Sequence, residues 1–218
     1  MKKIAITQRL VENGSYSEMR ECLDVNYSKL IYACGYLPIV LPYEVAFESY
    51  FKNIDISGVV LTGGNDLNCC HKSSLSKKRD LFEKKILKYC IENDIRILGI
   101  CRGMQLIAEY FKSDFKQVYN QVNVRYRLKI NQNSKYRDSL NSIKIVNSYH
   151  NFSVNKLSDQ MVVSATNENG VIKAIEHKNY KIFGQMWHSE RENPFNENEL
   201  NFIKDFFNFD IGRAQKLK

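Results

Sequence analysis

The sequence predicts an α/β fold built on a doubly wound, mostly parallel sheet. Two observations lead to this fold class. Apolar, strand-like runs alternate with amphipathic, helix-like runs along most of the 218 residues. Three of the apolar runs also end directly in polar or glycine-rich turns, which is where open parallel sheets place their sites. With 44% hydrophobic side chains, residues 1–218 can bury one sizeable core, so we expect a single domain.

The first half of the chain predicts four strands and four helices in alternation. The strands are expected over residues 3–7, 37–41, 58–61 and 95–100, and the helices over 16–34, 47–52, 79–93 and 103–111. Gly35 stands where it would end the first helix. In the third helix Phe82, Ile86 and Cys90 form one apolar stripe, and Arg79 and Glu83 are spaced to pair. Residues 66–77 read as a polar loop.

The second half predicts shorter strands and a closing helix. The strands are expected over residues 142–146, 161–166, 171–177 and 181–186, the helix over 197–209, and a frayed tail over 212–218.

A cysteine stands at a sharp turn between the fourth strand and the fourth helix, in the segment GICRGMQ at residues 99–105. Gly99 and Gly103 lie two residues to either side of Cys101, which is the pattern of a nucleophile elbow with cysteine in place of serine. Glycine is needed there because side chains would clash with the neighbouring strand and helix. The helix N-terminus would favour the thiolate of Cys101. The alternative is a buried structural cysteine at a strand end.

A nucleophilic cysteine needs a base, and the base needs a group that orients it. The segment WHSE at residues 187–190 ends a predicted strand. In an extended chain His188 and Glu190 would project to the same side, so Glu190 could fix the imidazole tautomer. By itself this pair also fits a histidine on an edge strand beside a solvated glutamate.

The glycine pair after the third strand, in TGG at residues 62–64, suits an oxyanion hole. Gly63 lets the backbone come close to a ligand, and we assign one oxyanion donor to the N–H of Gly64. The N–H of Arg102, next to the nucleophile, would be the other donor. The alternative is an ordinary turn between a strand and a loop.

These motifs, in this order and spacing, resemble the class I glutamine amidotransferases, whose fold is flavodoxin-like. The details are most similar to their gamma-glutamyl hydrolase branch. Four features carry this closer resemblance: IAITQR at residues 4–9, RDLFE at 79–83, Cys-Arg-Gly in the elbow, and VNSYH at 146–150. The chain departs from the family at Ser189, where proline is usual, and at 149–151, where the hydrolases often carry paired histidines.

The resemblance implies hydrolysis of a gamma-glutamyl amide through a thioester on Cys101, with His188 as base and Glu190 holding it. It also implies that Gln105, Asn147, Ser148, Tyr149 and His150 bind the glutamyl group. Three functions compete: a free-standing hydrolase, a glutaminase subunit that passes ammonia to a synthase, and a non-catalytic binding protein. Hydrolases of this kind cleave gamma-glutamyl polyamines or, for capsule biosynthesis, gamma-glutamyl-CDP-amidate.

Charge and cysteine usage limit the partners. The formal net charge is +8, but the basic residues are spread along the chain, so we expect no nucleic-acid partner. A locally basic, aromatic stretch at 124–137 is either a polar excursion or a wall that attracts an anionic substrate, with Tyr126 stacking on a base. We favour the anionic, phosphate-bearing leaving group. A homodimer is one oligomeric state that the sequence allows.

The six cysteines are scattered, so we expect reduced thiols, no metal site at Cys69, Cys70 and His71, and no cofactor. The start of the chain is basic and runs straight into a strand, and no apolar run reaches membrane length. We therefore expect a cytoplasmic protein without a signal peptide or membrane contact.

Overall fold

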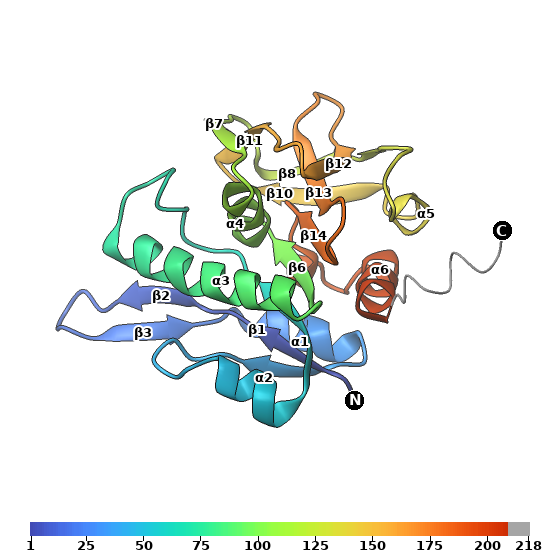
Figure 1. Ribbon diagram of the computed structural model, residues 1–218. Helices are drawn as coiled ribbons and strands as arrows, with labels where there is room; N and C mark the ends of the chain where they lie inside the picture. The colour runs from blue at the N-terminus through green and yellow to red at the C-terminus, as the bar shows by residue number, and fades with distance from the viewer. Residues whose placement is uncertain (209–218) are drawn as a thin grey trace.

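The computed structural model describes residues 1–208, and a central sheet organises them. The strands of this sheet are β1 (Lys3–Ile6), β4 (Leu37–Val40), β5 (Ile56–Leu61), β6 (Arg96–Ile100), β9 (Lys129–Ile130), β12 (Met161–Thr166), β13 (Ile172–His177) and β14 (Ile182–Gln185). Their order is β4-β1-β5-β6-β14-β13-β12-β9 (Figure 1). The strands from β4 to β14 are parallel, and the last three are antiparallel. The predicted mostly parallel α/β fold is confirmed.

Helices cover both faces of the sheet. They are α1 (Val25–Ala33), α2 (Glu48–Ile54), α3 (Ser74–Glu92), α4 (Arg102–Tyr110), α5 (Arg137–Leu140) and α6 (Glu197–Asn208). On one face α6 packs against the sheet and against the end of α1, where the Cys34 thiol lies 3.8 Å from the Leu200 carbonyl oxygen. On the other face α3 lies between α2 and α4, with Phe51 and Tyr89 in ring contact at 5.0 Å. This three-layer packing encloses the apolar core.

Three two-stranded ribbons stand outside the sheet (Figure 1). They pair β2 (Arg9–Glu12) with β3 (Met19–Cys22), β7 (Asp114–Gln117) with β11 (Phe152–Lys156), and β8 (Val122–Arg127) with β10 (Ile145–Tyr149). The first ribbon corrects the helix predicted over 16–34, of which only Val25–Ala33 is helical. Residues 19–22 instead pair with 9–12, and Asp24 caps α1 by accepting the N–H of Asn26 at 2.9 Å.

Most other predicted elements are present with shifted ends. Gly35 follows α1 with a φ of 82°, as predicted for a helix stop. Helix α3 begins at Ser74, earlier than predicted, because Ser73 accepts the N–H of Ser76 at 3.0 Å. The strand predicted over 142–146 runs instead over Ile145–Tyr149. The predicted end of the last helix at Phe209 and the tail 212–218 lie outside the described residues.

Across residues 1–208, no helix combines the length and apolar character needed to cross a membrane.

Candidate active site

Cys101 occupies a strained turn between β6 and α4, as the elbow pattern predicts. It has φ 53° and ψ −104°, and it is the N-cap of α4. The space beside the two flanking glycines is too small for any side chain. A β-carbon on Gly103 would lie 2.0 Å from the carbonyl oxygen of Leu61, and one on Gly99 would lie 2.6 Å from the backbone of Gly103. Because Arg102 is the first helical residue, its N–H is among those without an acceptor inside the helix.

Cys101 lines a pocket of about 330 Å³ beyond the carboxyl ends of β5, β6 and β14. These three strands are neighbours in the sheet, so the turns that follow them meet there. The pocket is lined by Arg9, Gly64, Asn65, Asp66, Cys101, Arg102, Gln105, Tyr149, His150, Asn151, His188 and Arg191. The structure therefore brings the glycine pair, the cysteine and the histidine together.

His188 and Glu190 are both buried and form a short ion pair, with 2.5 Å between His188 Nδ1 and Glu190 Oε1. Nε2 of His188 has no hydrogen-bond partner among the described residues. Burial lowers the pKa of His188, but the Cys101 thiolate and the Glu190 carboxylate raise it to about 10. At neutral pH the histidine is therefore an imidazolium.

The predicted reason for this pairing was wrong, although the pair is present. The strand β14 ends at Gln185, and residues Ser189–Arg191 form a short 3₁₀ helix, η1, rather than extended chain. A tight turn brings Glu190 back to His188, and Asn147 fixes that turn. Its side chain accepts the His188 N–H and donates to the His188 carbonyl oxygen, both at 2.8 Å.

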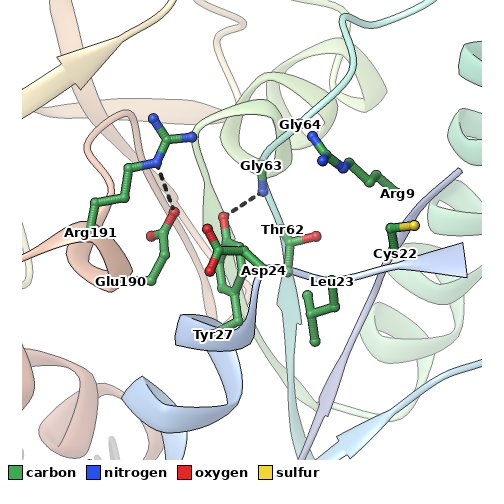
Figure 2. A pocket seen from close by; sticks show the side chains of 10 residues that line it. All are labelled: Arg9, Cys22, Leu23, Asp24, Tyr27, Thr62, Gly63, Gly64, Glu190 and Arg191. Atoms are coloured by element: carbon green, nitrogen blue, oxygen red, sulfur yellow. Dashed lines mark hydrogen bonds and ion pairs between the residues drawn. The ribbon is translucent and has the colours of Figure 1, made fainter. Parts of the chain in front are cut away.

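The loop after β5 is held by Tyr27 and Arg79. The N–H of Gly63 donates to the Tyr27 hydroxyl at 2.9 Å, and Figure 2 shows this bond beside Glu190. Arg79 donates to the carbonyl oxygens of Thr62 at 2.8 Å and Gly63 at 3.0 Å. The N–H of Gly63 is occupied, whereas that of the next residue, Gly64, has no acceptor among residues 1–208, and Gly64 has a φ of 106°.

Tyr27 was absent from the predicted site. Burial and the neighbouring Glu190 carboxylate raise the pKa of Tyr27 well above its ordinary value, so its hydroxyl stays protonated. The hydroxyl that accepts the Gly63 N–H therefore lies close enough to feel the charge of the carboxylate that orients His188.

Four buried charges tie the glycine loop to the elbow. Arg79 and Glu83 pair at 3.1 Å as their spacing predicts, and the guanidinium of Arg102 contacts both Glu83 and Asp80. Opposite charges and hydrogen bonds compensate the cost of burying these groups. The side chain of Arg102 therefore has a structural role, because it binds Asp80 and Glu83. Its backbone N–H lies at the start of α4.

The residues expected to bind a glutamyl group divide into two sets. Gln105, Tyr149 and His150 line the pocket, and the amide nitrogen of Gln105 donates to the Phe152 carbonyl oxygen at 2.8 Å. That bond leaves the Gln105 side-chain oxygen available. Asn147 and Ser148 are buried and do not line the pocket.

His150 is locked by Lys173, a residue that the sequence did not point to. The ammonium of Lys173 is fully buried and lies 2.9 Å from each of three acceptors, the Gln121 amide oxygen, the Ser148 hydroxyl and His150 Nε2. His150 Nδ1 must then carry the proton donated to the Phe152 carbonyl oxygen at 3.0 Å. Burial and the Lys173 charge lower the pKa of His150 to about 3, so this imidazole is neutral and unsuited to be the base.

Lys173 is a buried cation without a carboxylate partner among residues 1–208. Burial lowers the pKa of Lys173 to about 8, and the Cys101 thiolate opposes that shift. The Tyr126 ring lies 4.9 Å from the ammonium. Tyr126 is therefore committed to this cluster rather than to a base-stacking surface.

The basic stretch 124–137 does not form a wall of the pocket. Most of its basic residues lie on the β8–β10 ribbon or in α5, and none of them lines the pocket. Arg125 pairs with Glu192 at 2.9 Å, and Arg137 with Asp138 at 3.0 Å. The pocket instead carries Arg9 and Arg191, which were not predicted as site residues.

Metal ligands do not cluster in the part of the chain that the structure describes: it contains no group of three or more His, Cys, Asp or Glu residues placed to hold an ion. Cys69 and Cys70 lie side by side, with 3.9 Å between their sulfurs, and all six cysteines are unpaired.

Comparison with known proteins identifies relatives over nearly the whole chain. The sequence profile of the family Peptidase C26 matches residues 4–190. The chain is 40% identical to the gamma-glutamyl-CDP-amidate hydrolase of Campylobacter jejuni, over 94% of this chain and 96% of that protein. It is 29% identical to a glutamine-hydrolysing GMP synthase of Borrelia garinii, over 69% of this chain and 26% of the synthase.

The fold is also found among solved structures. A glutamine amidotransferase of Thermotoga maritima superposes with a TM-score of 0.64 at 15% identity, covering 100% of this chain and 86% of the other. At this identity the likeness concerns the fold alone.

Proposed function

Because the chain belongs to the peptidase C26 family, we propose that it is a gamma-glutamyl hydrolase whose nucleophile is Cys101. Residues 1–218 would act as one hydrolase domain. The observation that carries the proposal is the meeting of three turns in one pocket. They place a buried Cys101 beside His188, and Glu190 lies 2.5 Å from the other nitrogen of that imidazole.

The first half-reaction forms a thioester. The Cys101 thiolate attacks the δ-carbonyl carbon of the glutamyl group, and the carbonyl oxygen becomes an oxyanion. The imidazolium of His188 gives its Nε2 proton to the leaving nitrogen as the C–N bond breaks. Glu190 keeps Nδ1 protonated throughout, so Nε2 is the nitrogen that exchanges the proton.

The oxyanion needs donors that are already in place. We assign the N–H groups of Gly64 and Arg102 to this role. The bond from Gly63 to Tyr27 supports the choice, because it removes the competing N–H of the same loop. Water then attacks the thioester with His188 Nε2 as base, which releases glutamate and restores the thiolate.

The glutamyl group would lie against α4 and the β8–β10 ribbon. The free side-chain oxygen of Gln105 is suited to accept from the α-ammonium group. Tyr149 and His150 shape the same wall, and Asn147 and Ser148 support it by holding His188 and Lys173.

For the leaving group we propose a phosphoramidate such as CDP-amidate, with a role in capsule biosynthesis. The 40% identity to the Campylobacter jejuni hydrolase over 94% of this chain supports this choice. The alternatives are a gamma-glutamyl polyamine, or glutamine in a glutaminase subunit, which the GMP synthase relatives favour. The proposed hydrolase acts in the cytoplasm on a small anionic substrate, without nucleic acid, membrane or cofactor, and a homodimer is compatible with it.

The deciding experiment compares kcat/KM for gamma-glutamyl-CDP-amidate, glutamine and gamma-glutamyl-putrescine. We expect the phosphoramidate to be the best substrate. Faster turnover of glutamine would instead identify a glutaminase subunit, and faster turnover of the putrescine conjugate a polyamine hydrolase.

The nucleophile is tested with the same substrates. Cys101→Ala should abolish turnover, while Cys69→Ala, at an exposed thiol, should retain it. Acid quenching of the wild-type reaction should trap the glutamyl group on the peptide that contains Cys101. Full activity of Cys101→Ala, or the adduct on another cysteine, would refute the mechanism.

A further inference from the structure

Two arginines face the pocket with little to neutralise them. Arg9 and Arg191 line the main pocket and also a smaller hollow of about 70 Å³ that adjoins it, shown in Figure 2. Among the described residues, the guanidinium of Arg9 has no hydrogen-bond or ion-pair partner. The nearest contact of Arg191 to a carboxylate is 3.8 Å, to Glu190 Oε1, which already binds His188.

The pocket also contains one other arginine, Arg102, and carboxylates. Arg102 is satisfied by Asp80 and Glu83. One further carboxylate, Asp66, lines the main pocket, and Asp24 in the smaller hollow caps α1. The Arg9 guanidinium, which is unpaired among the described residues, and that of Arg191, whose one carboxylate contact is at 3.8 Å, are therefore the cations at the mouth that an anionic group could contact.

Both arginines are held close to the reacting groups. A β-carbon on Gly64 would lie 3.1 Å from Arg9 Cδ, so the Arg9 side chain lies over the proposed oxyanion donor. The guanidinium of Arg191 stacks on the Tyr149 ring at 4.6 Å, which limits its motion. Figure 2 shows the two guanidinium groups on opposite sides of Gly63.

The position of Arg191 identifies the half of the substrate that it meets. His188 must protonate the leaving nitrogen, so the leaving group lies on the His188 side of Cys101. Arg191 belongs to the same turn, because its N–H donates to the His188 carbonyl oxygen at 3.1 Å. The glutamyl group would lie at Gln105 and His150, and Tyr149 of the same wall contacts both Arg191 and the His188 ring, so it adjoins the leaving-group side.

We infer that Arg9 and Arg191 form a subsite for the phosphoryl group of the leaving group. This inference rests on the proposed function. In a gamma-glutamyl phosphoramidate the phosphorus is bonded directly to the scissile nitrogen, so its oxygens lie at the mouth while the carbonyl carbon is at Cys101. A guanidinium presents paired N–H donors that match two phosphoryl oxygens, which a neutral or cationic amine cannot use.

The kinetic test measures selectivity, defined as kcat/KM for gamma-glutamyl-CDP-amidate divided by kcat/KM for gamma-glutamyl-p-nitroanilide. Both substrates carry the same glutamyl group, but the anilide lacks the phosphoryl group. Arg9→Gln and Arg191→Gln should each lower selectivity by about 10- to 100-fold, the range for one charge-assisted contact. The matched control Arg137→Gln removes an exposed arginine outside the pocket and should preserve selectivity. Equal losses on both substrates would assign the arginines to the glutamyl half and overturn the inference.

A binding measurement decides the question without turnover. In the Cys101→Ala background, phosphoramidate itself is titrated by calorimetry. We expect each arginine substitution to weaken its affinity at least tenfold, and the Arg137→Gln control to leave it unchanged. Unchanged affinity in the Arg9 and Arg191 variants would refute the subsite. If the wild-type protein cleaves neither glutamyl substrate, the proposed function fails, while the calorimetric result still decides the phosphoryl subsite.

Discussion

Replacing the buried Lys173 with methionine should change how the free energy of unfolding depends on pH. The pKa of Lys173 is lowered from 10.5 to about 8 by burial. In the unfolded chain this penalty is absent, so the protonated lysine opposes folding below pH 8. At 1.36 kcal/mol per pH unit the cost is about 3 kcal/mol. It is relieved between pH 8 and 10.5, where the unfolded chain binds the proton and the folded chain does not.

Methionine has a similar volume and no charge, so it removes the penalty at all pH values. It also leaves the Gln121, Ser148 and His150 acceptors without their donor, at about 1 kcal/mol or more each. At pH 7 these effects nearly cancel, and the variant should be about as stable as the wild type. Between pH 7 and pH 10 the free energy of unfolding of the wild type should rise by up to about 3 kcal/mol relative to that of the variant.

Urea denaturation of both proteins at pH 7 and pH 10 measures this difference in the free energy of unfolding. Groups that titrate in the same way in both proteins contribute equally and drop out of the difference. Lys85→Met, at an exposed position of α3, is the matched control and should run parallel to the wild type. Parallel curves for Lys173→Met as well would refute the reasoning. The same buried charge keeps His150, which lines the pocket, neutral.

The remaining predictions concern the catalytic groups. His188→Asn should lower kcat by about 10⁴-fold, close to the loss in Cys101→Ala, because the two act as a unit. Glu190→Gln should cost less, about 10²-fold, and a rate near wild type for His188→Asn would show that another group is the base. Tyr27→Phe should lower kcat about tenfold with little change in KM, because the N–H of Gly63 loses its acceptor. Steady-state kinetics with the anilide measure all of these, and an unchanged kcat in Tyr27→Phe would exclude its positioning role.

The sequence predicted seven of the eight strands of the central sheet, all but β9, and the motifs at its carboxyl edge. Strands with continuous apolar side chains, the glycines around Cys101 and the spacing of the motifs are local signals, and the structure has all three. The β2–β3 ribbon was missed, because residues 16–34 were predicted as one helix. Residues 19–22 pair with residues 9–12 instead, across a loop of residues 13–18.

Site residues that are positioned by contacts distant along the chain could not be predicted from the sequence. Lys173 reads as an exposed lysine of a strand, and its burial depends on the β8–β10 ribbon, which folds over it from about 25 residues or more away along the chain. Tyr27 reads as a helix residue of the core, and its role depends on Gly63 and Glu190 reaching the same point. Neither arrangement leaves a local pattern.

The contact between the elbow and β5 also defines what can be exchanged when such an enzyme is redesigned. The backbone of Gly103 rests directly against Leu61, two residues before Gly63, so the elbow and the glycine loop form one closely packed block. This block has no tolerance for a side chain at Gly103. Arg9 and Tyr149, by contrast, come from the two-stranded ribbons, which are separate modules at the rim of the same pocket. New substrate preferences are therefore best sought by grafting or diversifying the ribbons while the elbow and the glycine loop are left unchanged.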